Sequence, residues 1–324
     1  MSHLFKNLFT RKPALKPILK KSQLHMEALE DRDLCAAGVW VDNHTLFIQA
    51  TNKGDKVVIS QYPGLDANSL ADNKVKVDWT HSGKTDHLSF NQYKYVNQGD
   101  KLVLQLDINN IDFNGGSGND TVKNLTDIKS TMRGHQGNDT LTGGTSQDML
   151  YGGTGSDTLY GSDGDDFLYA VEPNWNGSNV ATDRLFGGDG KDWLEGATGG
   201  VNFLYGEKGD DTLWGGIKKA TNFLYGGDDQ DEIYGGTATK GNALAVVNYI
   251  LDSNGVDWAW GGDYATNFVF LADGKPVQDD DKFIQGYKSN DYWNVDPEIQ
   301  YQGLFYGDHV YSKKKVGYTF DSVK

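Results

Sequence analysis

The sequence predicts an all-β protein whose centre is a flat solenoid of short parallel strands. Three observations lead to this prediction. Of the 41 glycines in the 324-residue chain, 27 lie between Gly115 and Gly236, so this stretch is about 22% glycine, whereas an average protein has roughly 7%. The same stretch holds 20 acidic and 8 basic residues, and therefore most of the chain's net charge of -15. Within it, a pattern of nine residues repeats.

The repeat reads Gly-Gly-x-Gly-x-Asp-x-U-x, where U is an apolar residue. Its phase survives an interruption at residues 170–184 and two stretched copies that carry Asn202 and Asn222 in the Asp position. Self-similarity at a fixed period is the signature of a repeat architecture. The copies begin at Gly115, Gly134, Gly143, Gly152, Gly161, Gly187, Gly196, Gly206, Gly215 and Gly226.

Nine residues are expected to form half of one solenoid coil. Glycine turns the chain, because it adopts positive φ at little cost, and a three-residue strand then points its central U side chain inward. Two such units complete a coil. The predicted inward column is Val122, Met132, Leu141, Leu150, Leu159, Leu168, Leu185, Leu194, Leu204, Leu213, Leu224 and Ile233.

The Asp at the sixth position indicates a metal. Stacked coils bring Asp carboxylates that are eighteen residues apart within a few ångströms, where they would repel one another without a counter-charge. Ca²⁺ accepts six to eight oxygen ligands, which carboxylates and turn carbonyls can supply. The candidate metal ligands are Asp120, Asp139, Asp148, Asp157, Asp166, Asp183, Asp192, Asp211 and Asp231.

Spacing distributes these residues over the two edges of the solenoid. One edge of the first block holds Asp120, Asp139 and Asp157, and the other holds Asp148 and Asp166. In the second block one edge keeps three acids, while the opposite edge contains two amides, so we expect weakened or absent calcium sites there. The edges would be exchanged between the blocks if residues 170–184 replaced one half-coil. The second-block edges are Asp192, Asp211 and Asp231, and Asp183, Asn202 and Asn222.

The nonapeptide resembles that of the RTX family, the hemolysin-type calcium-binding repeats. The resemblance covers Gly115–Gly236, and the copies at Gly115, Gly152 and Gly187 match the pattern completely. It implies a parallel β-roll that binds several Ca²⁺ ions between successive turns and is unfolded without them. The acidic, glycine-rich composition independently favours such coupled folding. The alternative that Asp and Gly only mark turns does not account for the constant phase.

Residues 1–37 are predicted to form a basic export segment that is disordered or cleaved. Met26–Ala37 reads MEALEDRDLCAA, which resembles an atypical LEDR-type N-terminal export segment of extracellular bacterial proteins. The segment lacks the apolar core of an ordinary signal peptide, and a disordered basic tail is the alternative. We therefore expect an extracellular or cell-surface protein.

The flanks of the repeats are expected to be rich in strands. Residues 38–114 are predicted to be a cap of degenerate repeats, residues 115–240 the calcium-binding roll, and residues 241–324 a Tyr- and Trp-rich segment of unknown function. Terminal units of repeat arrays are atypical because they close the ends. Predicted flanking strands are Thr45–Ala50, Lys56–Gln61, Lys74–Thr80, Lys101–Leu106, Asn267–Leu271 and Val316–Phe320.

An aromatic residue ends most repeats and is expected to point outward. Monomers seldom leave large apolar patches bare, so cover by the flanking segments is the favoured interpretation, and a binding face for sugars or a partner is the alternative. The latter requires exposed rings at Tyr151, Tyr160, Tyr205 and Tyr225.

The leading hypothesis is therefore an exported calcium-binding protein with a structural or adhesive role. A cell-surface polysaccharide or protein is a candidate partner. No catalytic constellation, apolar stretch long enough to cross a membrane, or basic surface for nucleic acid is expected, and the lone Cys35 excludes a disulfide scaffold. Two alternatives stay open. One is a secreted hydrolase with its catalytic part in residues 241–324 and the roll as scaffold, and the other is carbohydrate or surface adhesion through the aromatic face.

Overall fold

Two parallel sheets of short strands face each other along the repeats. In the computed structural model, the described residues contain 27 strands and no helix, and hence no helix that could cross a membrane. They belong to one unit, Cys35–Lys324, and the predicted export segment 1–37 lies outside them. The described residues are 38–62, 74–91, 93–98, 101–106, 108–173, 179–239, 246–252, 258–271, 282–284, 290–294, 309–313 and 318–322.

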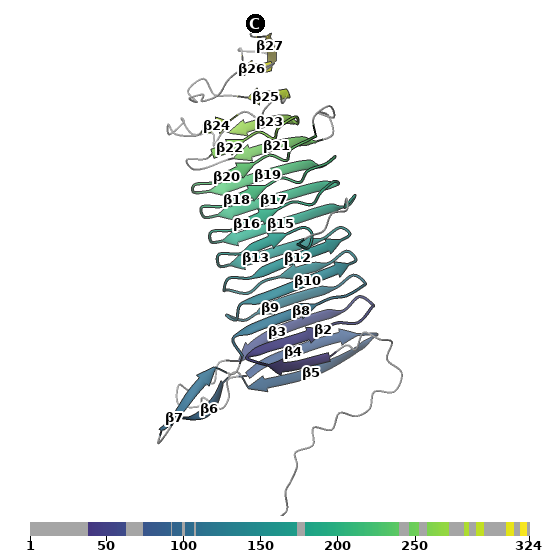
Figure 1. The fold of residues 1–324 in the computed structure, drawn as a ribbon, viewed down its shortest axis with the longest axis vertical. Helices are drawn as coiled ribbons and strands as arrows, with labels where there is room; N and C mark the ends of the chain where they lie inside the picture. The colour runs from purple at the N-terminus through teal and green to yellow at the C-terminus, as the bar shows by residue number, and fades with distance from the viewer. Residues whose placement is uncertain are drawn as a thin grey trace, which may run out of the picture. The chain divides into compact units, whose positions relative to one another are not determined.

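Successive repeats alternate between the two sheets, which we call sheet A and sheet B. Figure 1 shows the strands stacked coil upon coil. Sheet A is formed, in spatial order, by β1 (Gly38–Asp42), β2 (Thr45–Gln49), β8 (Asn110–Asn114), β10 (Ser130–Gln136), β12 (Met149–Thr154), β14 (Phe167–Tyr169), β16 (Trp193–Glu195), β18 (Thr212–Trp214), β20 (Glu232–Tyr234), β22 (Trp258–Trp260) and β24 (Lys282–Ile284).

Sheet B runs the same course on the other side of the core. The hairpin of β6 (Tyr93–Gln98) and β7 (Lys101–Leu106) stands apart from both sheets. In spatial order sheet B is formed by β5 (Lys84–Asn91), β4 (Lys74–His81), β3 (Lys56–Tyr62), β9 (Thr121–Leu125), β11 (Thr140–Thr142), β13 (Thr158–Asp163), β15 (Thr182–Asp189), β17 (Val201–Lys208), β19 (Thr221–Asp228), β21 (Val247–Asp252), β23 (Thr266–Leu271), β25 (Asn290–Asn294), β26 (His309–Lys313) and β27 (Tyr318–Ser322).

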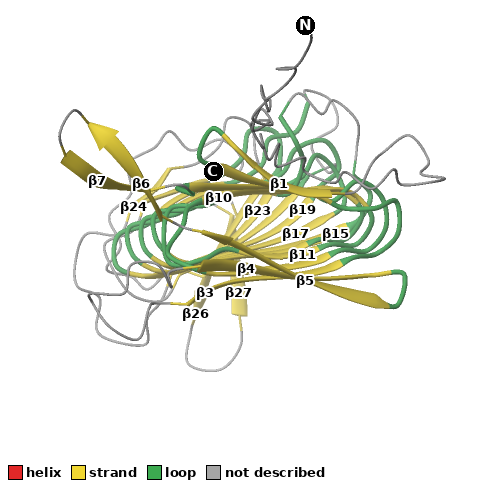
Figure 2. Ribbon diagram, turned by 90° about the horizontal axis from the view of Figure 1, so that it is seen from below, coloured by secondary structure: helices red, strands yellow, loops and turns green. Residues whose placement is uncertain are grey.

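The core is the predicted column of U side chains. Strands pair so that U meets U, as in Leu150 with Leu168 on sheet A and Leu141 with Leu159 on sheet B. All twelve side chains of the predicted column are 0% exposed. The view along the solenoid in Figure 2 shows the two layers of strands with loops at both sides. The predicted all-β roll is thereby confirmed, because a three-residue strand between glycine turns has one inward position to fill.

The interruption at residues 170–184 does not exchange the edges. It connects β14 in sheet A to β15 in sheet B, as an ordinary turn between repeats does. Leu168 pairs with Leu194, and Leu159 pairs with Leu185, across it. The chain thus passes from sheet A to sheet B across the interruption, and both Asp columns continue on its far side.

The N-terminal flank supplies antiparallel strands at one end of the sheets. β2 and β3 join the solenoid in parallel with β8 and β9, whereas β1 pairs antiparallel with β2, and β4 and β5 follow β3 as an antiparallel meander. Antiparallel hairpins complete the ends because short turns join them without a further coil.

The C-terminal flank extends both sheets past residue 240. β21 pairs in parallel with β19, and β22 pairs in parallel with β20, so no break in the sheets marks the boundary that the glycine content suggested. The spacing of the sixth and eighth repeat positions persists here in Asn248-Tyr249-Ile250 and Asn267-Phe268-Val269, although the glycines become rare. Glycine content thus underestimates how far the coil continues.

Candidate metal centre

The predicted Asp residues form two buried columns, one at the edge of each sheet. Each Asp precedes or opens a strand, and none of the nine is more than 2% exposed. The sheet-B column contains Asp120, Asp139, Asp157 and Asp183. The sheet-A column contains Asp148, Asp166, Asp192, Asp211 and Asp231. The structure therefore brings together the residues that the spacing had grouped.

One carboxylate oxygen of each Asp is bound by the neighbouring coil. In the sheet-B column the backbone N–H of Asp139 donates to Oδ1 of Asp157 at 2.8 Å, and the N–H of Asp157 donates to Oδ1 of Asp183 at 3.1 Å. The sheet-A column repeats the arrangement, with 2.7 Å from Asp166 N to Asp192 Oδ1. Since each bond joins consecutive coils, Oδ1 sets the stacking of the turns.

The second carboxylate oxygen, Oδ2, is buried without a hydrogen-bond donor at six of these residues. A Cβ added to Gly152 would lie 2.6 Å from Asp157 Oδ2 and 2.8 Å from the carbonyl oxygen of Ala170 in the next coil. Both oxygens therefore lie against Gly152, where only the Cα hydrogen of a glycine fits, and no hydrogen-bond donor is directed at Asp157 Oδ2. The six residues are Asp120, Asp139, Asp157, Asp166, Asp192 and Asp211.

This arrangement suits a hard cation. The described residues contain no group of three or more Asp, Glu, His or Cys side chains that could hold a metal ion by themselves, so each position would combine the carboxylate of one coil with carbonyl oxygens of the turns. Ca²⁺ prefers such mixed oxygen ligands and tolerates irregular geometry. A buried carboxylate without a partner is costly, and a bound cation removes that cost. The donor set therefore fits calcium.

Two predicted ligands differ from the others because the protein already satisfies both oxygens. Oδ2 of Asp148 accepts a hydrogen bond from the backbone N–H of Gly144 at 2.5 Å, and Oδ2 of Asp183 accepts one from Nδ2 of Asn179 at 3.0 Å. Asn179 lies within the interruption at residues 170–184, where the sequence pattern shows no ligand. These two carboxylates therefore have fewer free lone pairs to coordinate a metal than the carboxylates whose Oδ2 has no donor.

The column also starts earlier than the perfect repeats. Asp55 is buried, and its backbone N–H donates to Oδ1 of Asp120 at 2.6 Å. Its own carboxylate accepts bonds from Trp79 Nε1 at 3.0 Å and from Thr51 N at 2.7 Å. Asp55 is thus the first residue of the sheet-B column, and protein groups donate to both of its carboxylate oxygens. In the sequence, the dipeptide Gly54-Asp55 of a degenerate repeat indicates this position.

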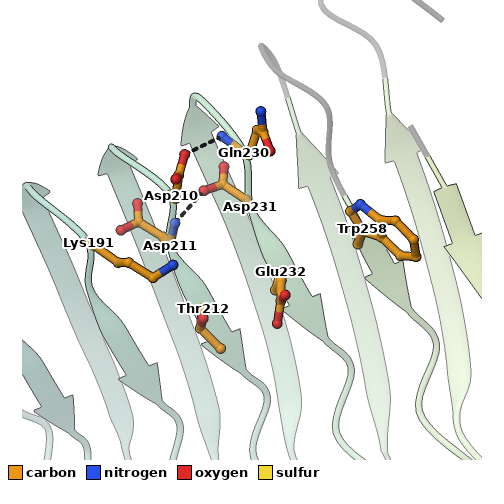
Figure 3. Close-up of a pocket in the computed structure, with 8 residues that line it drawn as sticks. All are labelled: Lys191, Asp210, Asp211, Thr212, Gln230, Asp231, Glu232 and Trp258. Carbon is orange, nitrogen blue, oxygen red and sulfur yellow. Dashed lines mark hydrogen bonds between the residues drawn. The ribbon is translucent and has the colours of Figure 1, made fainter. Parts of the chain in front are cut away.

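A polar pocket of about 190 Å³ opens beside the sheet-A column (Figure 3). It exposes the turn in which Asp211 N donates to Asp231 Oδ1 at 2.9 Å and Gln230 N donates to Asp210 Oδ1 at 3.2 Å. Four of its lining residues are acidic and one, Lys191, is basic. Such a lining raises the local concentration of cations.

Burial raises the pKa of the carboxyl groups from Asp120 to Asp211 in the two columns. Loss of solvation is the largest cause, hydrogen bonds from the neighbouring backbone oppose it, and adjacent carboxylates add to it in most cases. The pKa rises from 3.8 to about 8 at Asp157 and Asp211, to about 7 at Asp192 and to about 6 at Asp139. Without a cation, these groups tend to hold protons in the folded protein.

The calcium-free protein should therefore lose stability as the pH rises. Its carboxyl groups titrate near 3.8 when unfolded and at about 6 to 8 when folded, so between these values the unfolded state binds fewer protons. The free energy of unfolding then decreases with increasing pH. Melting curves of chelator-treated protein at about pH 5 and about pH 8 test this, since the higher pH should give the lower midpoint. A midpoint that increases with pH would contradict the assignment.

The outward aromatic rings of sheet B stack on one another along the solenoid. One row consists of Tyr160, Phe186, Tyr205 and Tyr225, with centroids 4.6–4.9 Å apart. A second row consists of Phe203, Phe223, Tyr249 and Phe268, with centroids 4.7–4.9 Å apart. The described strands of the flanks extend the two sheets at their ends.

This stacking limits what the rows can bind. Each ring covers the faces of its neighbours, so solvent meets mainly ring edges, whereas stacking on a sugar requires a free face. Tyr160 is 39% exposed, but Tyr151, on sheet A, is only 8% exposed and stacks on Tyr169 at 5.1 Å. The exposure that a sugar-binding face requires is therefore met at Tyr160 and not at Tyr151.

Comparison with known proteins identifies the repeats. The sequence model of the RTX calcium-binding nonapeptide repeat matches four times, at residues 133–168, 181–200, 197–217 and 220–238. No curated protein and no solved structure matches the chain. The matched residues include eight of the nine predicted ligands, and Asp120 precedes them. Residues 133–238 are thus RTX calcium-binding nonapeptide repeats, and such repeats imply calcium binding.

Proposed function

We propose that this chain is an exported structural or adhesive protein whose coils are held together by several Ca²⁺ ions. The observation that carries the proposal is the set of six buried Oδ2 atoms without a donor. The ligands would be the column carboxylates, with Asp157 beside the Ala170 carbonyl as the model case. Bound calcium would supply the positive charge that these oxygens lack.

Coupling of folding to calcium follows from the position of the ligands. The carboxylate and the carbonyl oxygens of one site belong to different coils, as Asp157 and Ala170 do, so an unfolded chain has no site, and binding energy becomes folding energy. Extracellular calcium modules typically bind at about 10⁻⁴ to 10⁻³ M, a range in which folding begins only where calcium is abundant. An exported protein would fold on arrival outside the cell.

The two alternatives have weaker support. Among the described residues, the carboxyl groups with large pKa increases lie between Asp120 and Asp211, inside the repeats, and the described strands after residue 240 extend the sheets. Ring-to-ring stacking on sheet B leaves few free faces for sugars. A structural role, or adhesion through another surface, is preferred for these reasons.

Substituting a single column residue tests the assignment. Asp157→Asn keeps the Oδ1 acceptor for the Asp139 N–H but replaces the unpartnered Oδ2 by an NH₂ group. We expect titration calorimetry to show about one Ca²⁺ fewer per chain, because the position loses its charged ligand. Asp127→Asn, the same change at an exposed turn residue, should leave the number of ions unchanged. Equal stoichiometry in both variants would contradict the proposed ligand.

A further inference from the structure

The sheet-B column changes its chemistry after Asp183. The next four positions are Asn202, Asn222, Asn248 and Asn267, and each side chain is 0% exposed. The parallel register places them in line, with Asp183 opposite Asn202 and each Asn opposite the next. Four consecutive coils therefore carry a neutral amide where the earlier coils carry a carboxylate.

The amides form a continuous hydrogen-bonded ladder along the solenoid. Nδ2 of Asn202 donates to Oδ1 of Asn222 at 2.9 Å, Asn222 donates to Asn248 at 2.7 Å, and Asn248 donates to Asn267 at 2.6 Å. In each of these three bonds the amide nitrogen donates to the Asn of the following coil. The ladder thus joins coils in the same direction as the Asp column does.

Each amide is also paired with its own turn. Asn222 Oδ1 accepts the N–H of Gly216 at 2.9 Å, and its Nδ2 donates to the carbonyl of Gly216 at 2.8 Å. Asn248 makes the same pair of bonds with Gly236, both at 3.0 Å. A primary amide can donate two and accept two hydrogen bonds. Asn222 and Asn248 therefore use their full capacity within the protein.

The NH₂ group occupies the place that the unpartnered oxygen holds in the Asp repeats. A Cβ on Gly215, the first glycine of this repeat, would lie 2.9 Å from Asn222 Nδ2, and a Cβ on Gly152, the first glycine of its repeat, would lie 2.6 Å from Asp157 Oδ2. No hydrogen-bond donor is directed at Asp157 Oδ2. Asn222 Nδ2 instead carries two hydrogens, which bond the Gly216 carbonyl and Asn248 Oδ1.

We propose that the amide ladder from Asn202 to Asn267 replaces calcium on this edge. The inference rests on the proposed function, because it presupposes that calcium binds the Asp columns. The ladder then divides the roll into a part with metal at both edges and a part with metal at the sheet-A edge alone. Sheet-B strands β17, β19 and β21 are accordingly held together without calcium. Sheet-B strands β11 and β13, joined by Asp139 and Asp157, depend on it.

Hydrogen exchange of the full chain, followed by mass spectrometry with calcium and with a chelator, tests the division. After chelation, backbone amides of β17, β19 and β21 should exchange at least about tenfold more slowly than those of β11 and β13, because fully satisfied buried hydrogen bonds resist local opening. Equal loss of protection in both groups would overturn the ladder. Exchange that is unaffected by calcium throughout would contradict the proposed function, and the inference with it.

A substitution in the ladder gives a second readout. Asn222→Asp puts an oxygen against the Gly216 carbonyl and Asn248 Oδ1, so β17, β19 and β21 should lose protection in the chelated protein. Asn138→Asp makes the same change on an exposed side chain whose Oδ1 acceptor for Ser156 N is kept, and it should not affect these strands. Unchanged exchange in Asn222→Asp would overturn the proposal.

Discussion

Chelation of calcium at neutral pH is expected to unfold the coils from β9 to β14, the largest effect that we predict. In this part both edges depend on carboxylates, including Asp139, Asp157 and Asp166, whose Oδ2 atoms are buried without a donor. Without calcium at neutral pH, each such group must either stay charged in a buried site or take up a proton, and both cost free energy relative to the unfolded chain, whereas a typical domain is stable by only about 5–15 kcal/mol. A few such groups together therefore exceed the stability of the fold.

Circular dichroism and thermal melting of the full chain measure this effect. The part of the β signal that comes from the coils β9 to β14 should be lost on adding a chelator and return with excess Ca²⁺. Mg²⁺ at the same concentration is a control, because it demands a tighter octahedral geometry and retains its waters, so it should not restore the signal. A melting midpoint that is the same with and without calcium would refute the coupling of folding to the metal.

The substitution Gly155→Ala should be among the most damaging single replacements in the repeats. Gly155 has φ +122°, and a Cβ there would lie 2.6 Å from the carbonyl carbon of Gly137 in the preceding coil and closer still to its oxygen. An alanine requires the coils to separate at this turn, which disrupts the hydrogen bonds of both edges. We expect a loss of more than about 4 kcal/mol, a size reached by few single substitutions.

The substitution Gly83→Ala provides the matched control. Gly83 also has a positive φ, +78°, but a Cβ there would have no atom within 4 Å. Only the backbone cost of a left-handed alanine remains, about 1–2 kcal/mol. Denaturant unfolding of both variants in saturating calcium separates the two contributions. Similar losses in the two variants would show that close coil approach is not what demands glycine at position 155.

The regular part of the fold could be predicted from local pattern. Nine-residue periodicity placed Leu141, Leu150 and Leu159 in the core, and all are fully buried. The continuation after residue 240 was missed because glycine content was used as the guide. Asn248 and Asn267 kept the spacing of the sixth position, and following that spacing instead would have extended the solenoid.

The sequence by itself determined the repeat, the inward column and the grouping of the Asp residues, because each depends on spacing within one or two coils. Only the tertiary structure decided which carboxylates still lack a partner. Asp157 and Asp183 occupy equivalent repeat positions, yet Asn179 bonds Oδ2 of Asp183, and Oδ2 of Asp157 has no donor. The difference between the two Oδ2 atoms depends on the position of Asn179, which belongs to the interruption at residues 170–184. Likewise, Asn222 became part of a ladder only through contact with Gly216 and Asn248. Hydrogen-bond satisfaction depends on contacts between coils and turns, and a periodic pattern in the sequence does not specify them.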